Sequence, residues 1–235
     1  MKQVTLGRSS LVVSSVGYDL SPLEKISFQK SKDLLEKALD QGVTFFDIGL
    51  PSEERAKRIG HGTVGKRSSL VLAGSFAPVK PSEFEKQLKM VLRALKTDYL
   101  DLVQIHDPGY LPRTGDHEGF YDALMEAKKA GYLRSVGITT GTDMIAMNAL
   151  EFGWYDTLQY PWSKEVLLEE EGLPQDFLTF AREAKVGTIS VTLEPETEDV
   201  KEKQRIALEE ISYQSQFEDH TLLLPLEEAY TEVRL

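Results

Sequence analysis

Short apolar segments alternate with amphipathic segments along almost the whole chain of 235 residues. The segment 99–107, YLDLVQIHD, is nearly continuous in apolar residues, which is typical of a strand buried on both faces of a parallel sheet. The segment 80–98 has its apolar residues at helical spacing and Pro81 near its start, where proline favours a helix. The pattern predicts eight strands, at 3–19, 43–49, 69–76, 99–107, 133–139, 155–163, 188–193 and 220–226.

Every predicted strand except the last is followed by a predicted helix. In the segment 27–42, apolar residues recur at helical spacing and Gly42 provides a stop. The first strand segment opens with a predicted hairpin around residues 7–9, and the apolar run 11–16 follows it. The other predicted helices lie at 52–60, 80–98, 118–131, 143–153, 173–187 and 198–216.

Near-continuous strands separated by amphipathic helices indicate a parallel sheet with both faces covered. Eight such units close into a (β/α)8 TIM barrel of the α/β class, for which ~250 residues is typical, so the loops are expected to be short. The alternative is an open doubly wound sheet, but no strand is followed by a G-x-G-x-x-G turn. No linker or low-complexity break interrupts the pattern. Residues 1–235 are therefore predicted to form a single compact barrel domain, with no full helix after the last strand.

Composition excludes several classes of function. The chain has no cysteine, which excludes disulfides, thiolate zinc sites and cysteine nucleophiles. Its four histidines do not have the spacing of a metal site, so no metal is predicted. The formal net charge of -11 disfavours nucleic acid and anionic membranes as partners, because both bind basic surfaces. The sequence has no stretch typical of a signal peptide or a membrane span, and the expected location is the cytoplasm.

The function of a barrel is expected at the carboxyl ends of its strands. A ring of strand-end residues that contains Asp47 and His106 indicates acid–base chemistry or binding in one shared pocket. The expected partner in this pocket is a small molecule or a protein, and the sequence leaves the oligomeric state open. The strand ends carry Tyr18 and Asp19, Asp47, Ser75, His106 and Asp107, Thr139 and Thr140, Gln159 with Trp162, Thr192, and Pro225.

Six stretches of the chain carry a further pattern. The most specific is LKTDYLDLVQIHDP at 95–108, and the others lie at 4–22, 31–49, 52–60, 127–141 and 156–163. Together they resemble the aldo/keto reductase superfamily over roughly residues 1–193. The resemblance implies a (β/α)8 barrel with an N-terminal β-hairpin. It also implies a degenerate and C-terminally shortened member, which lacks the usual C-terminal helix and tail.

Members of this family reduce carbonyls with NADPH, and they use a tetrad of aspartate, tyrosine, lysine and histidine. By the resemblance, Asp47 matches the aspartate and His106 the histidine. The tyrosine should stand five positions after Asp47, where this chain has Ser52, and Ser75 replaces the lysine that ends the third strand. The proton donor and the cation that lowers its pKa are therefore both missing. Tyr18 is the candidate for a replacement hydroxyl, with a half-buried aromatic lid as the alternative interpretation.

The resemblance also implies contacts with the cofactor. Thr139 and Thr140 stand at a Ser-Asn pair of the family, and Gln159 matches a glutamine that holds the nicotinamide amide. Trp162 is expected at the rim of the same pocket. The family binds the adenosine phosphate with a basic segment, whereas this chain ends in the acidic PLEEAYTEVRL, which would repel a phosphate. No cofactor is therefore expected, or NADP if reductase activity is retained.

The candidate residues also have structural interpretations. Asp47 is suited to cap the next helix or brace its loop, and His106 to bridge strands as a core histidine. The charged run EERAKR at 53–58 is expected to face solvent, with charge pairs four residues apart.

Three functions fit the sequence. The first is a regulatory or binding protein that has lost carbonyl reduction, which accounts for the missing tyrosine, lysine and tail together. The second is a non-redox enzyme, such as a lyase, isomerase or cyclase, that uses Asp47 and His106, with or without Tyr18, as acid and base. The third is a residual NADP-dependent oxidoreductase that has rebuilt its proton donor.

Overall fold

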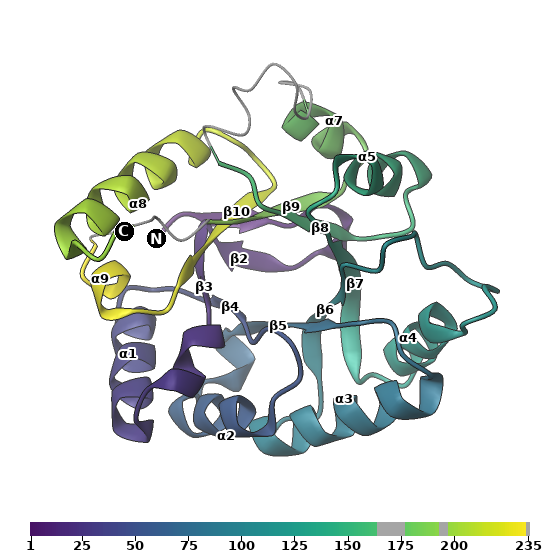
Figure 1. The fold of residues 1–235 in the computed structure, drawn as a ribbon, viewed down its shortest axis with the longest axis horizontal. Helices are drawn as coiled ribbons and strands as arrows, with labels where there is room; N and C mark the ends of the chain where they lie inside the picture. Colours follow the sequence, from purple (N-terminus) through teal and green to yellow (C-terminus); the bar gives the residue numbers. More distant parts are fainter. Residues whose placement is uncertain (164–176, 193–196, 234–235) are drawn as a thin grey trace.

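The structure, a computed structural model, describes residues 1–163, 177–192 and 197–233. Eight parallel strands close into a barrel in the order β10-β3-β4-β5-β6-β7-β8-β9, which confirms the predicted architecture (Figure 1). Their near-continuous apolar sequences fit this position, because each strand faces the barrel interior on one side and helices on the other. The strands are β3 (Val16–Asp19), β4 (Phe45–Asp47), β5 (Val71–Phe76), β6 (Leu100–His106), β7 (Leu133–Thr139), β8 (Thr157–Tyr160), β9 (Gly187–Val191) and β10 (His220–Pro225).

Helices surround the barrel on its outer side (Figure 1). In α3 (Pro81–Leu95), the predicted apolar face is buried, and Pro81 starts the first turn as expected. After β10, the described chain forms only the four-residue α9 (Glu228–Thr231). None of the described helices is both long and apolar enough to cross a membrane. The other helices are α1 (Phe28–Asp40), α2 (Glu53–Gly62), α4 (Phe120–Lys129), α5 (Asp143–Phe152), α7 (Phe177–Glu183) and α8 (Val200–Gln214), with short 3-10 helices η1 (Gly7–Ser9), η2 (Ser21–Lys25) and η3 (Arg67–Ser69).

Two of the predicted elements extend beyond the described ranges. The predicted helix 173–187 contains α7, and its first residues, 173–176, lie outside the described residues. The predicted strand 188–193 corresponds to β9, and its last residue also lies outside them.

The N-terminal hairpin packs against the barrel interior. Strands β1 (Gln3–Thr5) and β2 (Val12–Ser14) pair antiparallel, and apolar side chains of the hairpin and its turn form one cluster with side chains from five barrel strands. The first predicted strand segment, 3–19, therefore contains three strands, β1, β2 and β3, because Ser14 ends the hairpin before β3 begins. The Ser14 hydroxyl donates to the Val16 carbonyl at 2.6 Å, and the Ser14 N–H donates to the Thr44 hydroxyl at 2.9 Å.

A buried ion cluster joins three neighbouring strands near their amino ends. Asp101 on β6 is only 1% exposed. Its carboxylate lies 2.8 Å from the Arg67 guanidinium and 2.9 Å from that of Arg134, and it accepts the Leu72 N–H at 3.0 Å. Because the charge is paired and hydrogen-bonded, it joins β5, β6 and β7 without leaving an unsatisfied ion.

We expect Asp101→Ala to lower the free energy of unfolding by about 3 kcal/mol, measured by urea denaturation. The substitution removes the buried ion partner of Arg67 and leaves the Leu72 N–H without its acceptor. The matched control is Asp98→Ala, because Asp98 is exposed beside the start of the same strand. A surface change of this kind is expected within about 0.5 kcal/mol of wild type. Equal losses in the two variants would contradict the structural role of Asp101.

Candidate functional site

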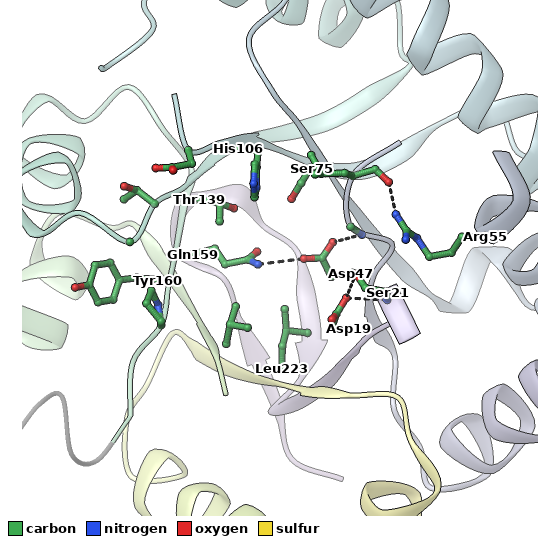
Figure 2. A pocket seen from close by; sticks show the side chains of 17 residues that line it. Asp19, Ser21, Asp47, Arg55, Ser75, His106, Thr139, Gln159, Tyr160 and Leu223 are labelled. Carbon is green, nitrogen blue, oxygen red and sulfur yellow. Dashed lines mark hydrogen bonds between the residues drawn. The ribbon is translucent and has the colours of Figure 1, made fainter. Parts of the chain in front are cut away.

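The carboxyl-end side of the barrel holds a cavity of about 490 Å³, and all eight barrel strands contribute to its lining (Figure 2). This volume lies in the range of small-molecule sites, and the position is that of active sites in barrels of this kind. The labelled lining residues in Figure 2 are Asp19, Ser21, Asp47, Arg55, Ser75, His106, Thr139, Gln159, Tyr160 and Leu223.

Asp47, the last residue of β4, is a carboxylate buried in this lining, with 4% of its surface exposed. Its Oδ1 accepts the Gly49 N–H at 2.8 Å, and its Oδ2 accepts the Gln159 side-chain amide at 3.1 Å. Burial, and next the negative charge of Asp19, raise the pKa of Asp47 to about 6, although both hydrogen bonds and the Arg55 charge act against this rise. Asp47 can therefore exchange a proton close to neutral pH.

A chain of side-chain hydrogen bonds inside the barrel ends on Asp47. The Thr157 hydroxyl donates to Gln104 Oε1 at 3.3 Å, and Gln104 Nε2 donates to Gln159 Oε1 at 3.5 Å. Gln159 Nε2 then donates to Asp47, so every donor in the chain points toward the carboxylate. Gly137 on β7 leaves space for it, because a Cβ there would lie 2.0 Å from Gln104 Oε1 and 2.1 Å from Thr157 Oγ1. This series of hydrogen bonds stabilises the ionised form of Asp47, which burial alone would neutralise.

Asp19 stands beside Asp47 at the end of the neighbouring strand. The two residues are Cα partners in the parallel pairing of β3 with β4. One oxygen of Asp19 accepts both the Ser21 N–H at 2.9 Å and the Ser21 hydroxyl at 2.7 Å. The site therefore has two adjacent carboxyl groups at one edge of the cavity.

Arg55 holds the loop between β4 and α2 in place. Its guanidinium donates to the carbonyls of Ile48 and Leu50 and pairs with Glu24 at 2.9 Å. In this loop, Gly49 has a φ of +65°, and a Cβ there would lie 2.7 Å from the Ser21 hydroxyl. The prediction that all of 53–58 faces solvent is wrong for Arg55, which is only 6% exposed, because loop carbonyls and Glu24 satisfy its donors. The predicted charge pairs four residues apart do form, between Glu53 and Lys57 and between Glu54 and Arg58.

Three polar side chains complete the lining from β5, β6 and β7. Ser75 is 4% exposed, and its hydroxyl makes no hydrogen bond with any described residue. Thr139 Oγ1 is buried and likewise has no partner among the described atoms. His106 is half-buried, and its ring makes no hydrogen bond within the described part of the chain. The side chains of Ser75 and His106 extend toward the open centre of the site (Figure 2).

The satisfied core histidine is His220, not His106. His220 starts β10 at the opposite end of the barrel. Its Nδ1 lies 2.8 Å from the Thr188 hydroxyl, and its Nε2 lies 2.6 Å from Gln214 Oε1. Burial lowers its pKa to about 3, so the ring is neutral. His106, by contrast, is half-buried and its ring makes no hydrogen bond among the described residues, so it does not bridge strands as a core histidine would.

The structure brings most of the predicted site residues together. Asp47, His106, Thr139, Thr140 and Gln159 all line the cavity. The Thr140 hydroxyl accepts the Thr142 N–H at 3.1 Å, so it also braces the start of α5.

Two predicted site residues lie outside the lining. Tyr18 is fully buried and donates its hydroxyl to the Tyr230 carbonyl at 3.1 Å, and burial raises its pKa far above the ordinary value. It is neither a replacement acid facing the cavity nor a half-buried lid, because its neighbour Asp19 takes the cavity-facing position. Trp162 is 1% exposed and packs between Tyr160 and Phe177, rather than at the rim.

Three residues that shape the site were not predicted. Gln104 offered a signal, since it is a polar residue inside the apolar run of the fourth predicted strand. Gly137 lies within a predicted strand, where glycine marks a close approach of neighbouring atoms. Nothing in the charged run EERAKR distinguishes the buried Arg55 from its exposed neighbours.

Comparison with known proteins identifies the family. The model of the aldo/keto reductase family matches residues 15–192, which is more than half of the chain. The chain belongs to the aldo/keto reductase family. The methylglyoxal reductase DkgB of Salmonella typhi is 39% identical over 84 residues, which cover 29% of this chain and 30% of that protein. The aldo-keto reductase YhdN of Bacillus subtilis is 25% identical over 175 residues, which cover 68% of this chain and 50% of that protein. The chain thus spans half or less of the length of these curated relatives.

Solved structures of aldo-keto reductases share the fold. The holo form of AKR11C1 from Bacillus halodurans superposes with a TM-score of 0.76 at 18% identity, covering 100% of this chain and 90% of that one. An aldo-keto reductase from Klebsiella pneumoniae in complex with NADPH gives a TM-score of 0.77 at 16% identity, covering 99% and 88%. At these identities the likeness shows the barrel fold alone.

We expect the free energy of unfolding of the wild type to fall, relative to that of the Asp47→Asn variant, as pH rises from about 4 to about 7. The Asp47 pKa is raised from 3.8 to about 6, so the folded protein binds this proton more tightly than the unfolded chain does. The stabilising effect is complete below the unfolded pKa and is lost as pH rises through the folded pKa, by about 3 kcal/mol in total. Urea denaturation across this pH range measures the difference. Asp98→Asn is the control at an exposed carboxyl, and a wild-type–Asp47→Asn difference that does not change with pH would refute the prediction.

We expect Gly137→Ala to lower the free energy of unfolding by about 1–3 kcal/mol, because the new methyl group overlaps Gln104 and Thr157. Gly141→Ala is the matched control, since a Cβ at Gly141 meets nothing within 4 Å. Denaturation of both variants measures the effect. Equal stability of the two variants would contradict this prediction, because it would mean that Gln104 and Thr157 can move aside without a loss of stability.

Proposed function

We propose that this member of the aldo/keto reductase family does not reduce carbonyls with NADPH and that it binds a small molecule in the strand-end cavity. One observation carries the proposal, namely the composition of the lining around Asp47. Asp47 and His106 are retained, but Ser75 stands at the position of the family's lysine. The loop after β4, where the family's tyrosine would follow, is instead a short turn held by Arg55.

Among the described residues, the lining also lacks an available phenol to act as the proton donor that the family uses. Carbonyl reduction needs a general acid within hydrogen-bond reach of the carbonyl oxygen. The described lining has a single phenol, that of Tyr160, and its hydroxyl already donates to Asp143. Burial and this hydrogen bond raise the pKa of Tyr160, which makes it a weaker acid. Ser75 and Thr139 offer aliphatic hydroxyls, and no described lysine lines the cavity to activate them.

The described lining does not fit a nicotinamide dinucleotide well either. A pyrophosphate needs cations or available N–H donors. The one arginine of the described lining, Arg55, instead donates its hydrogen bonds to Glu24 and to loop carbonyls. The side-chain amide of Gln159, which the family resemblance assigns to the nicotinamide, bonds Asp47 and Gln104. Solved aldo-keto reductases from Klebsiella pneumoniae contain NADPH or NADP, so NADP is the cofactor whose binding decides the proposal.

A second candidate is a non-redox enzyme that uses Asp47 and His106 as acid and base. It is favoured by the Asp47 pKa of about 6 and by the open position of His106 in the same cavity. Residual NADP-dependent reduction is the third candidate, and family membership supports it. A cytoplasmic location, and a small molecule or protein as the partner at the cavity, stay predictions.

We expect the purified protein to show no saturable binding of NADPH or NADP⁺ at millimolar concentrations, by calorimetry and by tryptophan fluorescence in parallel. The reason is the acidic, cation-poor lining described above. With methylglyoxal as the carbonyl, absorbance of NADPH at its reduced-nicotinamide band should not fall faster than in buffer.

The positive control is the Klebsiella pneumoniae aldo-keto reductase whose structure contains NADPH. Saturable binding of NADPH at low micromolar concentration, about -8 kcal/mol, would overturn the proposal and make the reductase the first candidate. Once a ligand is known, Asp47→Asn and His106→Asn separate binding from non-redox catalysis. An enzyme loses turnover while it still binds, whereas a binding protein has no turnover to lose.

A further inference from the structure

The charged groups around the cavity are predominantly acidic. Asp19, Asp47 and Asp107 line it from the ends of β3, β4 and β6, and Arg55 is the one lysine or arginine among the described lining residues. The Arg55 guanidinium is committed to Glu24 and to the carbonyls of Ile48 and Leu50, so it is not available to a ligand. A ligand that enters the cavity therefore meets negative charge, which favours a cation.

The two innermost carboxyl groups lie side by side. Asp19 and Asp47 are register partners on adjacent parallel strands, which lie about 4.8 Å apart. The Asp19 charge contributes to the raised pKa of Asp47, so the two groups repel each other in the absence of a ligand. A cation placed between them would relieve this repulsion.

Ser75 gives a second and independent sign of a ligand. It is only 4% exposed, yet its hydroxyl lines the cavity and has no hydrogen-bond partner among the described residues. This hydroxyl is open to the cavity, so a ligand there can donate a hydrogen bond to it. Ser75 lies on β5, next to β4, and its N–H donates to the Gly49 carbonyl at 3.0 Å, which fixes its position beside the Asp47 loop. Figure 2 shows it on the same side of the site as Asp47 and His106.

We propose that the cavity binds a small organic molecule through a primary ammonium group, held by the carboxylates of Asp19 and Asp47 and by the hydroxyl of Ser75. An ammonium group has three donors, and these three side chains offer three acceptor groups at one edge of the cavity. Leu50, Val191 and Leu223 provide apolar surface for the hydrocarbon part of the ligand. The inference rests on the proposed function, because it requires a cavity that is not filled by a nicotinamide.

Other cations fit the lining less well. No group of three or more His, Cys, Asp or Glu side chains within the described ranges is placed to hold a metal ion. Ca²⁺ takes about 6–8 oxygen ligands, and Mg²⁺ demands a near-ideal octahedral arrangement of its ligands. A quaternary ammonium prefers a cage of aromatic rings, and Tyr160 is the one tyrosine, tryptophan or phenylalanine among the described lining residues.

The test is calorimetric titration with n-butylamine and with n-butanol, which has a similar shape but no charge at neutral pH. We expect saturable millimolar binding of butylamine and no saturation by butanol. Asp19→Asn and Asp47→Asn should each weaken butylamine binding at least tenfold, and Ser75→Ala about fivefold. Asp98→Asn, an exposed carboxyl outside the cavity, should bind like wild type. Unchanged circular dichroism of each variant ensures that lost binding is not lost folding.

The pH dependence gives a second readout. Protonation of Asp47 removes one carboxylate, so butylamine binding should be at least fivefold weaker at pH 5 than at pH 8. The other titratable or charged groups at the cavity around Asp47 are Asp19 from β3, Arg55 from α2 and His106 from β6. His106→Asn, which should keep the pH dependence, separates any contribution of the imidazole from that of Asp47.

Each remaining outcome overturns the inference. Equal binding of butylamine and butanol would show an apolar site without ammonium recognition. Binding of Mg²⁺ that depends on Asp19 and Asp47, with no butylamine binding, would assign the carboxyl pair to a metal. If neither organic probe binds at about 50 mM, the ammonium site is rejected. Failure here leaves the proposed function standing, since that function is decided separately by the NADPH titration.

Discussion

A carboxylate buried at the end of one barrel strand governs the arrangement of the site. Asp47 has almost no contact with bulk water, so its charge must be stabilised by the protein. The stabilisation comes from Gly49 in its own loop and from the chain of Gln159, Gln104 and Thr157 across the barrel interior. This chain exists only because Gly137 has no side chain. The interior polar residues, the glycine and the acidic group therefore form one interdependent unit.

The same unit limits the chemistry available to the protein. The amide of Gln159 is oriented toward Asp47, and Arg55 is oriented toward the loop that follows it. Both side chains are consequently used to build the site rather than left to contact a ligand. The lining also holds the carboxylates, which can accept further hydrogen bonds, the Ser75 hydroxyl and the His106 ring, a set suited to cation binding or proton transfer rather than to phosphate binding.

The two ends of the barrel show the difference between structural and functional burial. At the amino end, Asp101 and His220 are buried with full sets of partners, and His220 is neutral. At the carboxyl end, Asp47 is held beside a second carboxyl, and the buried Thr139 hydroxyl has no partner among the described residues. Repulsion between the two carboxyl groups and a buried hydroxyl without a partner both reduce the stability of the fold. Such features are typical of a site shaped for a ligand.

The sequence by itself determined the eight strands, their order and the polar residues at their ends, because apolar runs and helical spacing are local properties of the chain. It also located Asp47, His106, Thr139 and Gln159 at one pocket, since parallel strands bring their carboxyl ends together. Only the tertiary structure decided between neighbours such as Tyr18 and Asp19. Successive side chains on a strand face opposite sides, but both sides of a barrel strand are covered, so polarity does not reveal which side faces the cavity. The burial of Arg55 likewise depends on carbonyls and a glutamate that only the folded chain brings to it.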